Sequence, residues 1–184
     1  MEMKKQKNRW IMLFCICCNT FCFGGVYAWS AFSGELANYM GWDYSKVTVA
    51  YSIMLMCVAL MGLVGGMLLQ RFGARKLMIA AGIMWGLGWF ATGMAGSIIM
   101  LYASFGILAG CASGFGYNPG VVTAVSWFPD KKGFASGMAV GTCGMASLIV
   151  APLANFLLTR FNVMTAFRLV GGMFLVVSLA TSWY

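Results

Sequence analysis

The sequence predicts an all-α membrane protein, built as a bundle of six transmembrane helices. Three observations carry this prediction: 61% of the residues are hydrophobic, only 9% are charged, and the apolar residues fall in six long runs. Soluble domains contain about a quarter charged residues, so four acidic residues in a chain of 184 are too few for a water-facing surface. Lipid offers backbone groups no partner, which allows only helices or closed barrels. The runs are unbroken instead of alternating, which indicates helices.

Each run approaches the length of about 20 apolar residues that a helix needs to cross the hydrocarbon layer. Polar or basic stretches separate the runs, and the longest of these extends from Glu35 to Lys46. We expect transmembrane helices at residues 10–32, 47–69, 77–95, 98–127, 133–158 and 166–184. If the bundle consists of two inverted three-helix repeats, residues 10–95 correspond to residues 98–184.

The basic residues predict how the bundle sits in the membrane. The amino-terminal tail, residues 1–9, holds four Lys or Arg residues, the 71–76 loop holds three, and the 131–132 loop holds two. The opposite side holds three: Lys46, Arg160 and Arg168. Cytoplasmic loops are enriched in Lys and Arg, so nine against three predicts a multi-pass protein of the cell (inner) membrane with a cytoplasmic tail at 1–9. Arg168 either extends to the outer interface or belongs to a site.

The same composition excludes several function classes. The net charge of +8 lies in short loops, without a basic stripe interleaved with aromatic residues, so we expect no nucleic-acid partner. The chain has no histidine, and no Asp or Glu lies inside an apolar run, so the acid–base groups of an enzyme are missing. All seven cysteines lie in apolar runs, and we expect neither a metal site nor a bound cofactor.

Glycines mark the expected contact faces of the helices, because helices in lipid associate through close packing that small residues permit. The densest run lies in the fifth span, where glycines recur every three or four residues and a proline follows: Gly133, Gly137, Gly141, Gly144 and Pro152. We expect this face to pack against another helix. The contact is either ordinary helix packing or a surface on which two bundles slide.

Polar and aromatic residues in the first and fourth spans indicate a cavity. Pro119 lies inside the fourth span and frees a backbone carbonyl, which needs a packed or wet neighbourhood. Tyr117 and Asn118 precede it, and the first span has a comparable group at Tyr27 and Trp29. In two inverted repeats these groups occupy equivalent positions, so the sequence predicts one substrate cavity between them. Tyr27 also suits a membrane interface, where tyrosine is enriched.

The loop after the second span resembles a signature of the major facilitator superfamily, in which glycine, an acidic residue, basic residues, glycine and a basic pair occupy fixed positions. The matching residues are Gly66, Arg71, Gly73, Arg75 and Lys76, and Gln70 stands where the family has the acidic residue. The resemblance implies one half of a twelve-helix fold, with alternating access and a second six-helix half beyond this chain. In the family this loop latches the two halves on the cytoplasmic side, and Gln70 brings no charge to such a latch.

A second stretch, residues 127–137, resembles the loop between the fourth and fifth helices of the oxalate:formate antiporter group, which is related to the monocarboxylate transporters. Residues 8–10 and 27–29 point the same way. The resemblance implies a secondary transporter for a small carboxylate, such as a monocarboxylate, formate or oxalate.

The same resemblance places Tyr27 and Tyr117 at aromatic positions around the substrate. Met54, Met56 and Leu60 replace more polar residues of the antiporter, which favours a less polar substrate such as a monocarboxylate.

Two questions stay open at the level of sequence. The chain stops at Tyr184 without a polar tail, which favours a piece of a longer transporter; the alternative is a self-contained six-helix protein that acts as a homo-oligomeric channel or transporter subunit. The sequence does not decide between antiport and proton symport, because residues that couple protons would lie in the second half beyond this chain.

Overall fold

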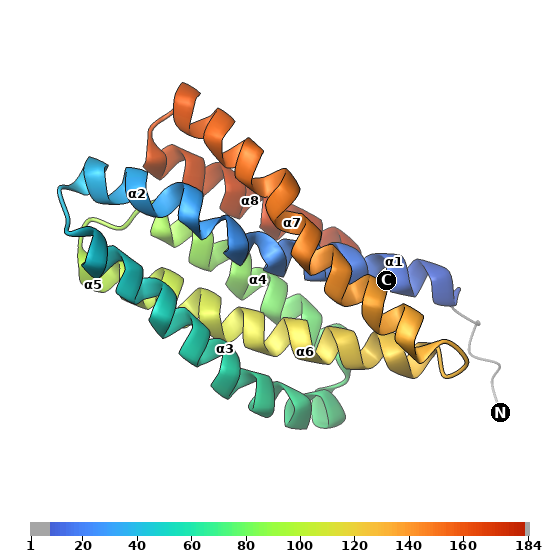
Figure 1. Ribbon diagram of the computed structural model, residues 1–184. Helices are drawn as coiled ribbons and strands as arrows, with labels where there is room; N and C mark the ends of the chain where they lie inside the picture. The colour runs from blue at the N-terminus through green and yellow to red at the C-terminus, as the bar shows by residue number, and fades with distance from the viewer. Residues whose placement is uncertain (1–7, 183–184) are drawn as a thin grey trace.

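The computed structural model describes residues 8–182, which form six helical rods joined by short turns (Figure 1). The first rod consists of α1 (Arg9–Phe23), the 3₁₀ segment η1 (Gly24–Ala28) and α2 (Trp29–Met40). The fourth consists of α5 (Ile98–Leu101), the π-helical segment η2 (Tyr102–Ala109) and α6 (Gly110–Trp127). The others are single helices: α3 (Tyr44–Phe72), α4 (Ala74–Thr92), α7 (Lys132–Arg160) and α8 (Val163–Ser182).

Five of the rods are long and apolar enough to cross a membrane: Arg9–Met40, Tyr44–Phe72, Ile98–Trp127, Lys132–Arg160 and Val163–Thr181. The remaining rod, α4, carries Arg75 and Lys76 in its first turn and lies beside α8 inside the bundle (Figure 1). The predicted all-α bundle of six helices is confirmed over the described residues.

The polar break expected from Glu35 to Lys46 is wrong. The first rod continues to Met40, and the turn occupies only residues 41–43, where Gly41 adopts a left-handed φ of 66°. The reason is that α2 keeps one buried face, with Phe32 and Leu36 fully enclosed. Glu35 and Asn38 lie on its exposed side. An amphipathic helix of this kind can be longer than the apolar run that predicts it.

The third helix also begins earlier than expected, at Ala74 instead of residue 77. Gly73 has a φ of 79°, a conformation that glycine adopts without strain, and it lets α4 start directly after α3 ends. Arg75 and Lys76 therefore belong to a helix and not to a loop.

The start of α1, the α3–α4 turn and the α6–α7 loop lie at one end of the bundle, which we call the basic end (Figure 1). An ion pair of 3.3 Å between Arg9 and Asp130 joins the first and last of these segments. The basic segments thus share one end, as six alternating rods require. Residues 1–7 of the tail and residues 183–184 of the sixth expected span lie outside the described part of the chain.

An aromatic core fills the bundle between α2, α4, η2 and α8. Its large buried members are Trp29, Phe32, Trp85, Trp89, Phe105, Phe167 and Phe174. The rings of Trp29 and Phe105 stack at 3.9 Å, and Trp89 meets Phe32, Phe105 and Phe174 edge to face. Aromatic pairs of this geometry add about 0.5–1.5 kcal/mol each to the burial of their area. This region is packed, and two hollows lie outside it, beside α3, α6 and α7.

Candidate functional site

A hollow of about 110 Å³ lies between the first rod, α3, α6 and α7, and we call it the tyrosine hollow. Its lining consists of Phe23, Val26, Tyr27, Tyr51, Met54, Leu55, Val58, Ser113, Tyr117 and Cys143. Three phenols, one hydroxyl and one thiol are the polar groups among these side chains. No charged residue of the described chain lines the hollow.

Tyr27 and Tyr117, which the sequence predicts as cavity residues, both line the tyrosine hollow. Tyr27 comes from η1 with 55% of its surface exposed, and Tyr117 comes from α6 and is partly buried. The structure therefore brings together two residues that lie far apart in the chain. Their contact with a substrate stays a prediction.

Two glycines bring the 3₁₀ segment η1 close to its neighbours. A Cβ atom on Gly24 would overlap the Cys143 carbonyl oxygen of α7, and one on Gly25 would overlap the Phe174 ring of α8. The rod is thus packed closely between two helices at the point where it changes from α-helical to 3₁₀ winding. Short 3₁₀ stretches inside a helix often mark functional hinges, and this one carries Tyr27.

A wider groove of about 680 Å³ extends along α3 and α6 toward the basic end. Tyr117 lines both this groove and the tyrosine hollow, so the two adjoin at its ring. Asn118 lies in the groove and not in the hollow, and its side-chain nitrogen covers Gly62 of α3. Apart from Tyr117, Asn118 and Gln70, the groove is lined by apolar residues.

Trp29 does not belong to either space, which corrects its prediction as a cavity residue. Only 5% of its surface is exposed, and its ring lies against Phe105 and Phe167 in the aromatic core. The physical reason is its place on the rod: two residues after Tyr27, a side chain points to a different side of a helix.

The loop-motif residues divide among three surroundings. Gly66 and Gln70 line the groove, and Gly73 forms the α3–α4 turn. The Arg71 guanidinium lies 5.6 Å from the centre of the exposed Phe72 ring, and Lys76 is exposed. The motif therefore places an uncharged amide at the mouth of the groove and its cations around the turn.

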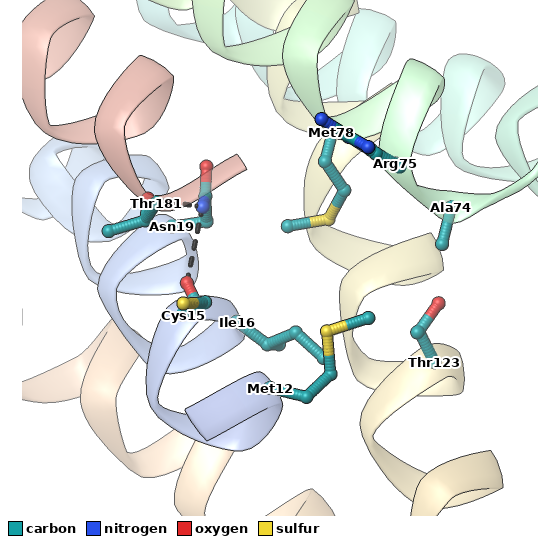
Figure 2. Close-up of a pocket in the computed structure, with 9 residues that line it drawn as sticks. All are labelled: Met12, Cys15, Ile16, Asn19, Ala74, Arg75, Met78, Thr123 and Thr181. Atoms are coloured by element: carbon teal, nitrogen blue, oxygen red, sulfur yellow. Dashed lines mark hydrogen bonds between the residues drawn. The ribbon is translucent and has the colours of Figure 1, made fainter. Parts of the chain in front are cut away.

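Arg75 lines a small pocket of about 30 Å³ between α1, α4, α6 and α8 (Figure 2). Figure 2 shows Met12 and Met78 reaching into this pocket from α1 and α4. The buried Asn19 side chain donates to the Cys15 carbonyl at 3.1 Å and to the Thr181 hydroxyl at 2.6 Å. The bond to Thr181 joins α1 to α8, and the bond to Cys15 lies within α1. We therefore interpret the pocket as a polar contact between helices at the basic end.

The glycine run of the fifth span faces away from the bundle. Gly133, Gly137, Gly141 and Gly144 are exposed, and a Cβ atom on any of them would meet nothing within 4 Å. Pro152 is exposed as well. The expected packing on this face is therefore not made within the described chain, because α7 packs inward through a different set of small residues: Ala135, Ala139, Cys143, Ala146, Val150 and Ala154.

Sequence reasoning missed Tyr51 and Cys143, which complete the hollow from α3 and α7. Tyr51, Met54, Leu55 and Val58 are spaced three, four and seven residues apart, which is one helix face, and this period was the available signal. Met56 and Leu60, which were expected near the substrate, are more than half exposed and line neither space.

The Major Facilitator Superfamily profile matches residues 9–184. The chain is 36% identical over 143 residues to the uncharacterized MFS-type transporter YhjX of Escherichia coli K12, covering 78% of this chain and 36% of that protein. It is 32% identical over 165 residues to the oxalate:formate antiporter of Oxalobacter formigenes, covering 89% and 39%. Mouse monocarboxylate transporter 3 is 29% identical over 167 residues, covering 90% and 34%.

A solved structure of the peptide transporter POT, an E310Q mutant in complex with sulfate, has the same fold with a TM-score of 0.73. At 18% identity it covers 94% of this chain and 37% of that one. The chain thus spans less than two-fifths of the length of each of these proteins. Its helices, its relatives and its fold together identify it as a multi-pass membrane protein: the chain belongs to the Major Facilitator Superfamily of transporters.

Proposed function

We propose that this chain is one half of a secondary active transporter that moves a small carboxylate by alternating access. The observation that carries the proposal is the tyrosine hollow, in which Tyr27 of the first rod meets Tyr117 of the fourth. Transporters commonly build substrate sites where irregular helices of two repeats meet. Two of the similar proteins are named for carboxylates, the oxalate:formate antiporter and monocarboxylate transporter 3.

The chemistry of the hollow suits a carboxylate with a short apolar part. Phenol hydroxyls donate hydrogen bonds to carboxylate oxygens, and such bonds to a charged acceptor are stronger than neutral ones. Met54, Leu55 and Val58 offer apolar contact to the rest of the molecule. This lining favours a monocarboxylate over oxalate, which carries a charge at both ends.

The missing positive charge points to a second bundle of six helices. An anion in a membrane needs a compensating charge, and no lining residue of the described chain supplies one. We place the second bundle against the open glycine face of α7, with Gln70 beside the cytoplasmic mouth. In this arrangement the basic end faces the cytoplasm in the inner membrane, as the positive-inside rule favours.

The test is substrate counterflow in proteoliposomes that contain the transporter, measured over a panel of small mono- and dicarboxylates. Tyr117→Ala should lower uptake at least tenfold with normal membrane insertion, because the substrate loses a wall and a hydroxyl group. Tyr117→Phe removes only the hydroxyl group, so it shows the contribution of the hydroxyl to uptake apart from that of the ring. Tyr39→Ala is the control, since Tyr39 is 55% exposed and lines neither space. Unchanged uptake kinetics in Tyr117→Ala would remove this residue from the site.

The same vesicles test coupling and orientation. Uptake driven by an imposed pH gradient indicates proton symport, and uptake that requires internal carboxylate indicates antiport. Single cysteines placed in the 71–76 and 131–132 segments should both react with an impermeant thiol reagent from the cytoplasmic side only. Labelling of the two segments from opposite sides contradicts the proposed topology.

A further inference from the structure

The wall of the tyrosine hollow that faces Tyr27 and Tyr117 comes from α7, through the side chain of Cys143. This residue is 6% exposed, and it is the single residue by which α7 lines the hollow among the described residues. Its side chain is small. The width of the hollow at this point therefore depends on where α7 sits and on what occupies position 143.

A hydroxyl pair fixes α7 against the first rod immediately before Cys143. The hydroxyl oxygens of Thr20 and Thr142 lie 3.0 Å apart, within hydrogen-bond distance. Thr20 is fully buried, and both hydroxyls also lie at 2.9–3.0 Å from backbone carbonyls of their own helices. Hydrogen bonds between helices in an apolar surrounding hold register as well as distance.

Gly24 makes the same contact with α7 about one helical turn after Thr20. A Cβ atom on Gly24 would overlap the Cys143 carbonyl oxygen and would lie 2.7 Å from the Ala146 side chain. The two backbones are therefore in direct contact, and the first rod leaves α7 no space to move inward. Thr20, Gly24 and Thr142 form a seam that holds Cys143 at a set distance from Tyr27.

We propose that Cys143 is a specificity-determining residue that limits the size of the transported molecule, with the α1–α7 seam as its positioning device. This inference rests on the proposed function, because it concerns the substrate of the same hollow. A wall held at a set distance from Tyr27 converts the volume of one side chain into a limit on substrate length. A hydrophobic pocket discriminates between substrates that differ by one methylene by about 10–200-fold. We expect an effect of this size from the side chain at position 143.

The first experiment measures uptake of straight-chain monocarboxylates from one to five carbons by the transporter and three variants. Cys143→Ser keeps the side-chain size and should keep the length profile. Cys143→Leu should lower uptake of the longest transported acids about tenfold more than uptake of the shortest. Cys143→Ala should shift the profile toward longer acids. A uniform change over all lengths in both Cys143→Leu and Cys143→Ala would overturn the proposal, since it indicates an effect on folding or turnover.

The second experiment tests the place of Cys143 without relying on any substrate. The intact transporter is treated with methanethiosulfonate reagents of increasing size, and the modified cysteines are identified by mass spectrometry. The smallest reagent should modify Cys143 and the bulkiest should not, whereas Cys22, which is 1% exposed and lines no hollow, serves as the unreactive control. Equal protection of Cys143 and Cys22 would overturn the proposal. If Cys143 is labelled as expected but the protein transports none of the carboxylates, the proposed substrate class is refuted. The position of Cys143 in the wall of the hollow is then still supported.

Discussion

The glycines of α6 and of α7 have nearly the same spacing and opposite surroundings. On the fourth rod, Cβ atoms at Gly106 of η2 and at Gly110 and Gly114 of α6 would each lie within 3 Å of α3, against side chains and backbone of that helix. On α7, Gly137 and Gly141 have only open space within 4 Å. A run of small residues therefore identifies a face suited to close packing, but it does not say whether the partner belongs to the same bundle.

The difference arises because α7 packs into the bundle through one small face and leaves a second small face open. Its inward face repeats Ala135, Ala139, Cys143 and Ala146, and this face makes the contacts with the first rod and α6. The glycine face lies on the opposite side and is free for a second body. Helix α6 uses its glycines inside the bundle, where Gly110 and Gly114 meet α3 and Gly116 meets α1 and α4. A small face that has no partner in the bundle is consistent with a helix that joins two bundles.

The largest expected effect is on the α6 face. Gly110→Leu should destabilise the chain by about 3 kcal/mol or prevent folding, because the new side chain has no room beside Met54 and Cys57 and overpacking costs at least 1–3 kcal/mol. Thermal unfolding of the protein in detergent, followed with a thiol-reactive dye, measures the loss. Gly141→Leu is the matched control and should unfold like the unmodified chain. Equal losses in both variants would erase the contrast between the two faces.

The next effect separates stability from transport on the α7 face. Gly141→Leu should leave the unfolding temperature of residues 1–184 unchanged, since nothing in the bundle contacts the new side chain. In the proposed transporter with a second bundle, the same substitution should lower uptake of the proposed carboxylate about tenfold or more, because the leucine would hold the two bundles apart. Wild-type uptake by Gly141→Leu would show that this face contacts lipid. Loss of a dimer of the chain itself would instead favour the homo-oligomeric alternative.

The six rods could be predicted because a long apolar run indicates a helix that lies in lipid. The ends of the rods could not be predicted where a helix continues beyond its apolar run. Helix α2 leaves the apolar run yet stays helical, because Leu36 still packs into the core. The irregular segments were also invisible in the sequence. The π-helical η2 is held by tertiary contacts such as the 3.1 Å approach of Ser104 to Thr92, which no local pattern reveals.

The candidate site was predictable on the rods that carry polar clusters. Tyr27 and Tyr117 stand in glycine-rich, polar surroundings within apolar runs, and both reach the hollow. Trp29 has the same surroundings and points into the core, because two residues along a helix change its direction. Tyr51 comes from a rod without such a cluster. Cys143 lies within the glycine run of α7, but it points inward while the glycines face outward, and only the packing of α3 and α7 brings the two residues to the hollow.

A smaller effect is expected at the seam that holds the inward face of α7. Thr142→Val keeps the side-chain shape and removes the hydroxyl that faces Thr20, which should cost about 1 kcal/mol in the free energy of unfolding. The loss stays small because the Thr20 hydroxyl retains the Cys17 carbonyl at 3.0 Å. Thr142→Ser should behave like the unmodified protein. A loss as large as that of Gly110→Leu would mean that one hydrogen bond, and not the small inward face, positions α7.

The smallest effect belongs to the loop that joins α6 to α7. Arg9 and Asp130 are paired at 3.3 Å with about half of each side chain exposed, and exposed pairs contribute about 0–1 kcal/mol. Asp130→Asn should therefore lower stability by less than about 0.5 kcal/mol, and the difference should vanish in high salt. Arg9→Gln should cost slightly more, because the guanidinium also lies 5.3 Å from the ring centre of the buried Phe128. Denaturant titrations at low and high salt distinguish the contribution of the ion pair from that of the contact between Arg9 and the Phe128 ring. A salt-independent loss of several kcal/mol in Asp130→Asn would mean that the loop, and not the helix faces, determines where α7 stands relative to α6.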